Sequence, residues 1–585
     1  MHSLTVKTNL LLTAGILLVG CSNPPAKGYA EPVQPKRVIV YTAKQIITMD
    51  PATPVATAVA VSDGRILAVG SRNEIFAQLE GHELVDDRSF AGKILMPGFI
   101  DNHLHPYLAG LLVPTTFIAP FDWDLLAGVV RGVKTQAAYR ARLSLAVSNL
   151  SNSEDWFITW GYHPYWHGEM SREYLNGVSS SRPLLVWHYS FHEVFMNDRA
   201  LEALGLTETD FDDPQMDWAT GHAWERGLFL EVFERLGPIL LEPIRFRKGI
   251  RDGFEMAQRN GLTTICDQGT PGIDLELEAE ALRTIATEDD VPVDILLIGN
   301  AVSMTAKLGA ERAFEVIGRL PQRNVDEVRY LPNQVKLFAD GAFYSQLMQM
   351  QEGYTDGHQG EWILQPDQLE AMARQYWNAD YTLHVHVTGD LGVEATLAII
   401  EKLQAERPRT AQPHTVLHHF GYATPEQTKR IARLGIWVSA NPYYLWALGE
   451  KYAEIGLGPE RAHHMVRLGS LEAHGVPISL HSDFTMAPAA PLLLAGIAAS
   501  RVTESGRVLG PSEKVSVATA LEGITIEAAR AIRQGDRIGS IEVGKEADFS
   551  VLEANPFEVD PSRWHDLGIW GTVSNGRVIP SHPAP

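Results

Sequence analysis

The feature that most constrains the fold is a long alternation of apolar runs with amphipathic segments between residues 94 and 500. The apolar runs, which we expect to be strands, cover 94–100, 184–187, 263–266, 293–298, 334–338, 382–387, 415–417, 436–439 and 478–480. Segments with helical periodicity separate them, such as 369–377, 393–403, 425–434 and 491–499. This order predicts an α/β fold made of parallel βα units, and about eight units predict a closed (β/α)8 TIM-type barrel with its site at the carboxyl ends of the strands.

The two ends of the alternation have a different pattern. Residues 37–70 contain short β-like runs around the turn pair Asp63-Gly64, and residues 538–580 contain similar runs around Asn575-Gly576. Asp-Gly and Asn-Gly between apolar runs are typical of hairpins. We therefore expect a small composite β-sandwich formed by residues 37–96 and 536–585, with a barrel domain over residues 97–535.

The first 36 residues have the pattern of an export signal. The apolar stretch 10–19 is too short for a lasting membrane helix, and it ends in Leu18-Val19-Gly20-Cys21. This sequence resembles the lipobox of bacterial lipoproteins. The resemblance implies a signal peptide over residues 1–20, lipidation of Cys21 and a tether over residues 21–36. We expect attachment on the periplasmic side of the cell envelope, at the outer membrane because Ser22 follows the cysteine; a plain secretory signal is the alternative.

Charge and cysteine content narrow the partners. The formal net charge is -22, and no long basic run could follow a phosphate backbone, so we expect no nucleic-acid binding. The chain has two cysteines, and lipidation of Cys21 would leave Cys266 without a partner for a disulfide. We expect membrane contact through the lipid anchor only, and the sequence leaves open whether the protein forms a homo-oligomer.

Histidines and a carboxylate follow several expected strands at the point where each strand ends. These residues are His103, His105, His386, His418, His419, His481 and Asp483. Residues two apart on a strand point to the same side, so His103 and His105 can bind one ion. Neutral imidazoles together with a carboxylate suit Zn²⁺ and similar ions.

Lys336 is unusual because it lies inside the apolar run 334–338. Burial of an unpaired ammonium costs several kcal/mol, so the residue needs an explanation. Its head either reaches solvent, meets a carboxylate, or is neutral and takes part in a site. Burial favours the neutral amine, which can react with CO₂ to form a carbamate.

Five motifs occur together in a recognisable order: 97–105, 335–341, 386–390, 482–483 and 538–548. With these motifs the chain resembles the amidohydrolase superfamily of metal-dependent hydrolases, specifically its amidohydrolase-3 or YtcJ-like group. The stretch 480–488 is most similar to a branch often labelled exoenzyme regulatory proteins, from which we infer no regulation. The resemblance covers nearly all of residues 37–580 and implies a (β/α)8 barrel with a β-sandwich built from both termini.

The resemblance also implies roles for individual residues. The implied metal ligands are His103, His105, Lys336, His386, His418 and Asp483, which hold two divalent ions, Zn²⁺ by expectation, bridged by carboxylated Lys336. Asp483 is also the implied acid and base, and His192 matches a histidine near the substrate, with a structural role as its alternative. Expected substrate contacts are Glu231, Phe343, Tyr344 and Tyr443. His384 and His481 remain open between partners of the ligands and interior barrel residues.

The favoured function is hydrolysis of a C–N bond in a small amide, N-acyl or N-formyl compound by metal-activated hydroxide. One alternative keeps the same site but cleaves an ester, a lactone or a cyclic amide. Another alternative is a non-catalytic, surface-anchored binding or regulatory protein on a barrel scaffold. The sequence does not identify the substrate, the metal or the number of ions.

Overall fold

The computed structural model describes residues 37–152, 155–288, 293–325 and 327–581. The expected lipobox and Cys21 lie outside these residues. Within them, three large β-sheets organise the molecule, and a two-stranded ribbon of β8 (Trp123–Leu125) and β9 (Gly128–Val130) accompanies them. None of the helices in this part of the chain combines the length and apolar content that crossing a bilayer requires.

A parallel eight-stranded sheet forms the centre of the molecule. In sheet order its strands are β21 (Ile478–Leu480), β20 (Trp437–Ala440), β19 (Thr415–His419), β18 (Thr382–Val387), β17 (Val328–Phe338), β16 (Asp294–Asn300), β15 (Leu262–Thr270) and β6 (Phe99–Leu104). The two outermost strands meet through side chains, since Asn102 Nδ2 donates to Ser479 Oγ at 2.9 Å. The sheet is a nearly closed barrel, which confirms the expected fold class.

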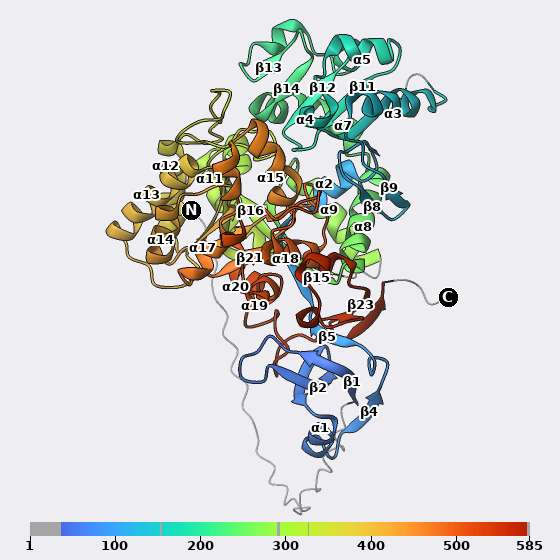
Figure 1. Ribbon diagram of the computed structural model, residues 1–585, viewed down its shortest axis with the longest axis vertical. Helices are drawn as coiled ribbons and strands as arrows, with labels where there is room; N and C mark the ends of the chain where they lie inside the picture. The colour runs from blue at the N-terminus through green and yellow to red at the C-terminus, as the bar shows by residue number, and fades with distance from the viewer. Residues whose placement is uncertain (1–36, 153–154, 289–292, 326, 582–585) are drawn as a thin grey trace, which may run out of the picture.

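Helices surround this barrel (Figure 1). They are α2 (Pro106–Leu112), α8 (Pro243–Arg259), α9 (Leu275–Glu288), α10 (Ala301–Leu308), α11 (Ala310–Arg319), α12 (Pro366–Asn378), α13 (Asp390–Glu406), α14 (Pro425–Leu434), α15 (Tyr443–Ile455), α16 (Pro459–His463), α17 (Leu468–Ala473), α18 (Pro491–Ser500), α19 (Val517–Glu522) and α20 (Ile526–Ala531). Local sequence explains their limits. In α14, Thr424 and Gln427 form a capping box, Pro425 occupies the first turn, and Gly435 ends the helix in the left-handed conformation.

Both ends of the described chain join in a second eight-stranded sheet, ordered β24-β23-β22-β5-β1-β2-β3, with β4 paired to β1. Its strands are β1 (Arg37–Ile47), β2 (Val55–Ser62), β3 (Arg65–Gly70), β4 (Glu83–Asp87), β5 (Ile94–Pro97), β22 (Phe549–Leu552), β23 (Ile569–Ser574) and β24 (Arg577–Pro580). Helix α1 (Arg72–Gln78) packs on it through Ile75. The β5–β22 pairing joins the two termini directly, so this composite unit forms as we expected.

A third sheet lies between β6 and β15 in the chain and was not expected. Its order is β13-β14-β12-β11-β10-β7, and its strands are β7 (Thr116–Phe117), β10 (Phe157–Tyr162), β11 (Leu184–His188), β12 (Glu193–Met196), β13 (Met216–Asp217) and β14 (His222–Trp224). The accompanying helices are α3 (Gln136–Ser148), α4 (Pro164–His167), α5 (Arg172–Val178), α6 (Asp198–Ala203) and α7 (Phe233–Leu240). The run 184–187 therefore belongs to this inserted subdomain and not to the barrel.

The misassignment has a physical reason. Leu184–His188 is buried along its whole length, as barrel strands are, and an apolar run alone does not tell which sheet a strand joins.

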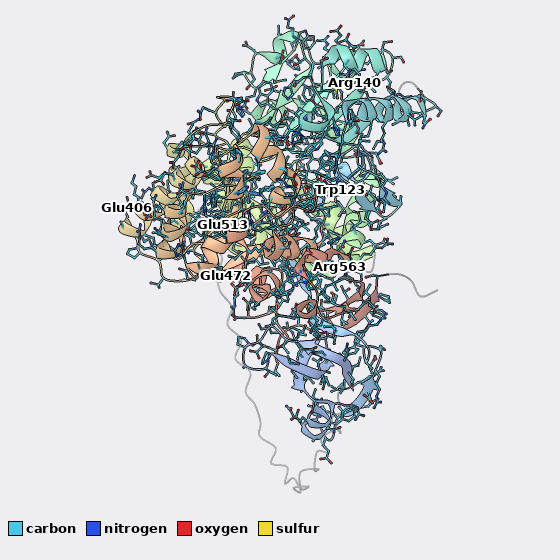
Figure 2. All side chains as sticks on the ribbon, viewed as in Figure 1. Trp123, Arg140, Glu406, Glu472, Glu513 and Arg563 are labelled. Atoms are coloured by element: carbon cyan, nitrogen blue, oxygen red, sulfur yellow. The ribbon has the colours of Figure 1, made fainter. Side chains whose placement is uncertain are left out.

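The inserted subdomain occupies one end of the long axis of the molecule, and the composite sheet occupies the other (Figure 1). Trp123 lies where the subdomain meets the barrel (Figure 2), with ring centroids 5.2 Å from Trp160 and 6.3 Å from Phe484.

Candidate metal centre

Three of the expected ligands meet where β6 and β21 end. His105 Nε2 lies 3.2 Å from Asp483 Oδ1, and His103 Nε2 lies 3.7 Å from the same oxygen. One ligand atom from each of these residues lies within 4.8 Å of the others, as a shared ion requires. His103 is buried, whereas the side chain of Asp483 is 14% exposed, so the carboxylate is the member of this trio that solvent reaches best.

Asp267 at the end of β15 orients His105. Its Oδ1 lies 2.9 Å from His105 Nδ1 and also accepts a hydrogen bond from the Gly269 amide at 2.6 Å. Burial alone would lower the pKa of His105, but the hydrogen bonds to Asp267 and Asp483 outweigh burial and raise that pKa to about 9. Donation from Nδ1 to Asp267 leaves Nε2 of the neutral ring for a metal, the usual carboxylate–histidine–metal arrangement.

A second group of nitrogens lies beside the first. Ligand atoms of His103, His419 and His481 also lie within 4.8 Å of one another. His481 Nε2 is 3.4 Å from His419 Nδ1, and His419 Nδ1 is 3.7 Å from Asp483 Oδ2. Two buried nitrogens, His386 Nε2 and His419 Nε2, have no hydrogen-bond partner. Buried polar atoms are normally satisfied, so these two nitrogens are candidates for binding a metal.

Lys336 is buried among these residues and does not reach solvent, since it is 1% exposed. Its Nζ lies 3.5 Å from His103 Nε2, and it pairs with His384 across β17 and β18. Burial lowers the pKa of Lys336 to about 7, against the opposing effect of the Asp483 charge. The alternative that the ammonium escapes to solvent is therefore excluded, and a neutral amine is accessible near pH 7.

His418, the expected ligand of β19, has both ring nitrogens in hydrogen bonds to other histidines. Its Nδ1 lies 3.0 Å from His103 Nδ1, and its Nε2 lies 3.0 Å from His384 Nδ1. The next residue, His419, instead has the unpartnered Nε2. The sequence showed the pair, but the family resemblance assigned the ligand role to His418 and gave none to His419.

The backbone explains why both histidines face inward. His419 has a φ of 75° and Phe420 a φ of 52°, so the chain leaves β19 in the left-handed conformation and strand alternation ends there. Asp483 likewise has a φ of 55°. Non-glycine residues held at positive φ are uncommon and gather at functional sites, where surrounding structure compensates for the strain.

His192 comes from the inserted subdomain. Its Nδ1 lies 2.8 Å from Glu225 Oε2, while the other carboxylate oxygen of buried Glu225 has no hydrogen-bond partner. Burial lowers the pKa of His192, but Glu225 and, more weakly, Asp483 reverse this and raise it overall. Glu231, an expected substrate contact, is exposed in the π-helical turn Gly227–Val232 and is not brought into the cluster. No sequence pattern marked Glu225.

Aromatic side chains also pack against the cluster, near His419 and Asp483. The Tyr444 hydroxyl lies 3.1 Å from His419 Nδ1, and the Phe343 ring stacks on Tyr444 with centroids 4.2 Å apart. Tyr344 donates from its hydroxyl to the Met486 carbonyl at 3.2 Å, three residues after Asp483. Tyr443 is buried and stacks on Trp446. Of the expected aromatic contacts, Phe343 and Tyr344 thus lie next to the cluster, and Tyr444 touches it directly.

The donor set fits a divalent metal. Ligand atoms of His103, His105 and Asp483 lie within 4.8 Å of one another, and His419 Nδ1 lies 3.7 Å from the other Asp483 oxygen. The His386 ring lies 4.2 Å from the His419 ring, and Nε2 of each of these two rings has no partner. Nitrogen and carboxylate donors of this kind suit Zn²⁺ and similar ions. The geometry offers two neighbouring groups that share His103, which is compatible with one or two ions.

The chain is similar to known proteins over most of its length. The model of the amidohydrolase family matches residues 90–580. Protein LONG AFTER FAR-RED 3 of Arabidopsis thaliana is 26% identical over 540 residues, which cover 89% of this chain and 88% of the relative. N-substituted formamide deformylase of Arthrobacter pascens is 23% identical over 560 residues, which cover 90% of this chain and 96% of the deformylase.

Among solved structures, a metal-dependent hydrolase of Pyrococcus horikoshii superposes with a TM-score of 0.67. The two sequences are 20% identical, and the superposition covers 90% of this chain and 99% of the Pyrococcus chain. At this identity the match establishes the fold alone. Sequence and structure comparisons therefore agree over nearly the whole described chain.

Proposed function

The chain belongs to the amidohydrolase family and is a metal-dependent hydrolase, and from that premise we propose that it cleaves the C–N bond of a small N-acyl or N-formyl compound. The observation that carries the proposal is the convergence of His103, His105 and Asp483 within 4.8 Å at the strand ends. The deformylase relative acts on N-substituted formamides, which favours an amide over an ester.

We propose that His103, His105, His386, His419 and Asp483 hold the ion or ions, with carboxylated Lys336 as a bridge when two are bound. When bound, a divalent ion lowers the pKa of a water molecule and polarises the carbonyl of the substrate. His419 takes the place in this set that the sequence gave to His418. The unpartnered Nε2 of His419 and the two occupied nitrogens of His418 support this choice.

Asp483 is the proposed proton carrier. Its partial exposure allows it to meet both water and substrate, and its hydrogen bond to His105 keeps the carboxylate in place. It takes a proton from the attacking water and delivers it to the nitrogen that leaves. Nearby, His192 donates from Nδ1 to Glu225, and Glu225 also favours the protonated ring by raising its pKa against the effect of burial, so the protonated ring can donate from Nε2 to the substrate carbonyl.

The experiment is metal analysis of the purified protein together with a panel of N-formyl amines, N-acyl amino acids, cyclic amides and esters. We expect one to two divalent ions per chain and turnover of formamides or acyl amides. Preferred turnover of esters or lactones would replace the C–N assignment. A protein with no metal and no hydrolysis would instead be a binding protein on this scaffold.

Asp483→Asn separates the acid–base role from ligand binding. Loss of a general acid–base group lowers kcat by about 10²- to 10⁴-fold. Retained metal with unchanged turnover would show that Asp483 carries no proton. His192→Phe is the companion variant, and we expect a smaller fall in kcat with metal content unchanged.

We also propose that the N-terminal segment anchors the protein through lipid on Cys21. The motif Leu18-Val19-Gly20-Cys21 supports this. Incorporation of labelled fatty acid into the wild type, compared with Cys21→Ser, tests it. A wild type that is processed without incorporating label would favour a plain secretory signal.

A further inference from the structure

We propose that Gln334, His384 and His418 form an oriented column of hydrogen bonds that fixes the His103 ring with its Nε2 lone pair facing the metal. These three residues are positioning residues and do not touch the reacting atoms. The inference rests on the proposed metal-dependent function and goes beyond it, because it assigns the tautomer of a ligand and the residues that set it.

The column runs through the interior of the barrel along the neighbouring strands β17, β18 and β19, and its last bond crosses to β6. Gln334 Oε1 lies 2.9 Å from His384 Nε2, and His384 Nδ1 lies 3.0 Å from His418 Nε2. His418 Nδ1 then lies 3.0 Å from His103 Nδ1. All four side chains are at most 2% exposed, so water does not compete for these bonds.

The direction of every bond follows from a single backbone group. Gln334 Nε2 donates to the Ile532 carbonyl at 2.9 Å, and a carbonyl can only accept. The amide NH₂ group therefore faces Ile532, and the amide oxygen faces His384. Consequently His384 must donate from Nε2 to that oxygen.

The remaining steps follow because a neutral imidazole carries one N–H. His384 donates from Nε2, so its Nδ1 accepts, and His418 must donate from Nε2 to it. His418 Nδ1 therefore accepts, and the donor to it is His103 Nδ1. This leaves His103 Nε2 as a bare lone pair, 3.5 Å from Lys336 Nζ and 3.7 Å from Asp483 Oδ1.

The neutrality of these rings has a physical cause. His384 and His418 are fully buried, and among the described residues neither ring hydrogen-bonds to a carboxylate, so the charged imidazolium is disfavoured at both positions.

The two adjacent ligands thus reach the same tautomer by different means. His105 donates from Nδ1 to the Asp267 carboxylate, whereas His103 donates from Nδ1 to a neutral column. The column orients His103 without adding a second negative charge next to Lys336 and Asp483. It also explains why two histidines occupy positions 384 and 418 without an open nitrogen for metal.

The first test reads the tautomer in the metal-free protein. We expect ¹⁵N spectra of histidine-labelled protein to show His103, identified by its loss in His103→Gln, with the proton on Nδ1. A proton on Nε2 would overturn the proposal. This measurement needs no metal and no variant of the column itself.

The second test measures metal affinity by competition with a chelator. We expect His384→Leu to weaken the affinity for Zn²⁺ by about 10- to 100-fold, the usual cost of losing a partner of a ligand. The matched control is His414→Gln, since His414 is a buried histidine bonded to Thr415 and the Leu434 carbonyl, outside the column.

The outcomes distinguish this inference from the proposed function. If the wild type binds no metal, the proposed function fails, while the spectrum still tests whether His103 carries its proton on Nδ1, as the column requires. If the wild type binds metal and His384→Leu binds it equally tightly, the column has no positioning role and the proposed function stands. If His414→Gln weakens binding as much as His384→Leu does, the effect is general destabilisation and the proposal is rejected.

Discussion

The barrel carries a buried cluster of titratable side chains at each of its two ends, and the clusters differ in how their charges are balanced. The strand-end cluster consists of His103, His105, Lys336, His386, His419, His481 and Asp483. The base cluster consists of Asp294, Glu546, Asp548, Arg329 and Arg537, and it lies where β16 begins and the composite sheet docks. Both bring together at least three candidate ligands.

Arginine distinguishes the base cluster. Arg537 Nη1 lies 2.9 Å from Asp294 Oδ2 and also pairs with Glu546, and Arg329 pairs with Asp294. Two permanently charged guanidinium groups thus neutralise the carboxylates, and Asp548 accepts a hydrogen bond from the Asn575 amide. In the strand-end cluster the basic side chain is Lys336, whose pKa burial lowers. Both clusters contain buried atoms without a hydrogen-bond partner, which are His386 Nε2 and His419 Nε2 at the strand ends and Asp294 Oδ1, Arg329 Nε and Arg537 Nη2 at the base. Carboxylates and arginines therefore make an interdomain ion-pair network at the base, whereas the histidine-rich cluster at the strand ends is the candidate ligand site.

The largest expected effect comes from the strand-end cluster. Lys336→Ala should remove metal and activity together. We expect kcat/KM to fall by about 10³-fold or more, since the bound ion lowers the activation barrier by several kcal/mol. Metal content and turnover are the measurements. Added acetate or propionate should restore part of the activity by replacing the carbamate oxygens. A variant with full metal content and normal turnover would refute the bridge.

The matched change at the base is Asp294→Asn. It removes the charge of a buried carboxylate that pairs with two partly exposed arginines, and breaking a buried pair costs up to about 3–5 kcal/mol of unfolding free energy. We expect a lower thermal midpoint with metal content and kcat at wild-type values. Loss of metal in this variant would contradict the view that the base cluster acts on stability alone.

The pH dependence of stability provides a sharper comparison. Burial, with the negative charge of Asp294 beside it, raises the pKa of Asp548 to about 8. Between about pH 4 and pH 8 the folded chain holds a proton that the unfolded chain has lost, so this group makes stability fall as pH rises through that window. Asp548→Asn should remove up to about 1.4 kcal/mol per pH unit of that slope. Chemical unfolding at several pH values measures it, and an unchanged slope would contradict a raised pKa.

The smallest effect is expected at the edge of the base cluster. Arg65 pairs with Glu546 at 3.2 Å, but its side chain is 49% exposed. Exposed pairs contribute about 0–1 kcal/mol, so Arg65→Gln should change the unfolding free energy by less than about 1 kcal/mol. A cost as large as that of Asp294→Asn would mean that the exposed pair matters as much as the buried ones.

Much of this molecule is predictable from sequence because strand ends in a parallel barrel share one edge. The order of apolar runs and helices predicts the barrel, and the turn pairs at both ends predict the composite sheet. The same rule predicts that His103 and His105 at the end of β6, His386 from β18 and Asp483 after β21 lie at one edge of the barrel. The inserted sheet escaped prediction because its buried strands have the same apolar pattern as barrel strands.

The sequence by itself determined the barrel, its family and the residue types gathered at its mouth. The tertiary structure alone decided which of two adjacent histidines has a free nitrogen, because the left-handed backbone at His419 breaks the alternation that sequence reasoning relies on. It also supplied Asp267, Glu225 and Tyr444 as partners of His105, His192 and His419. Such partners come from distant parts of the chain, and a hydrogen bond between them depends on packing that no local pattern encodes.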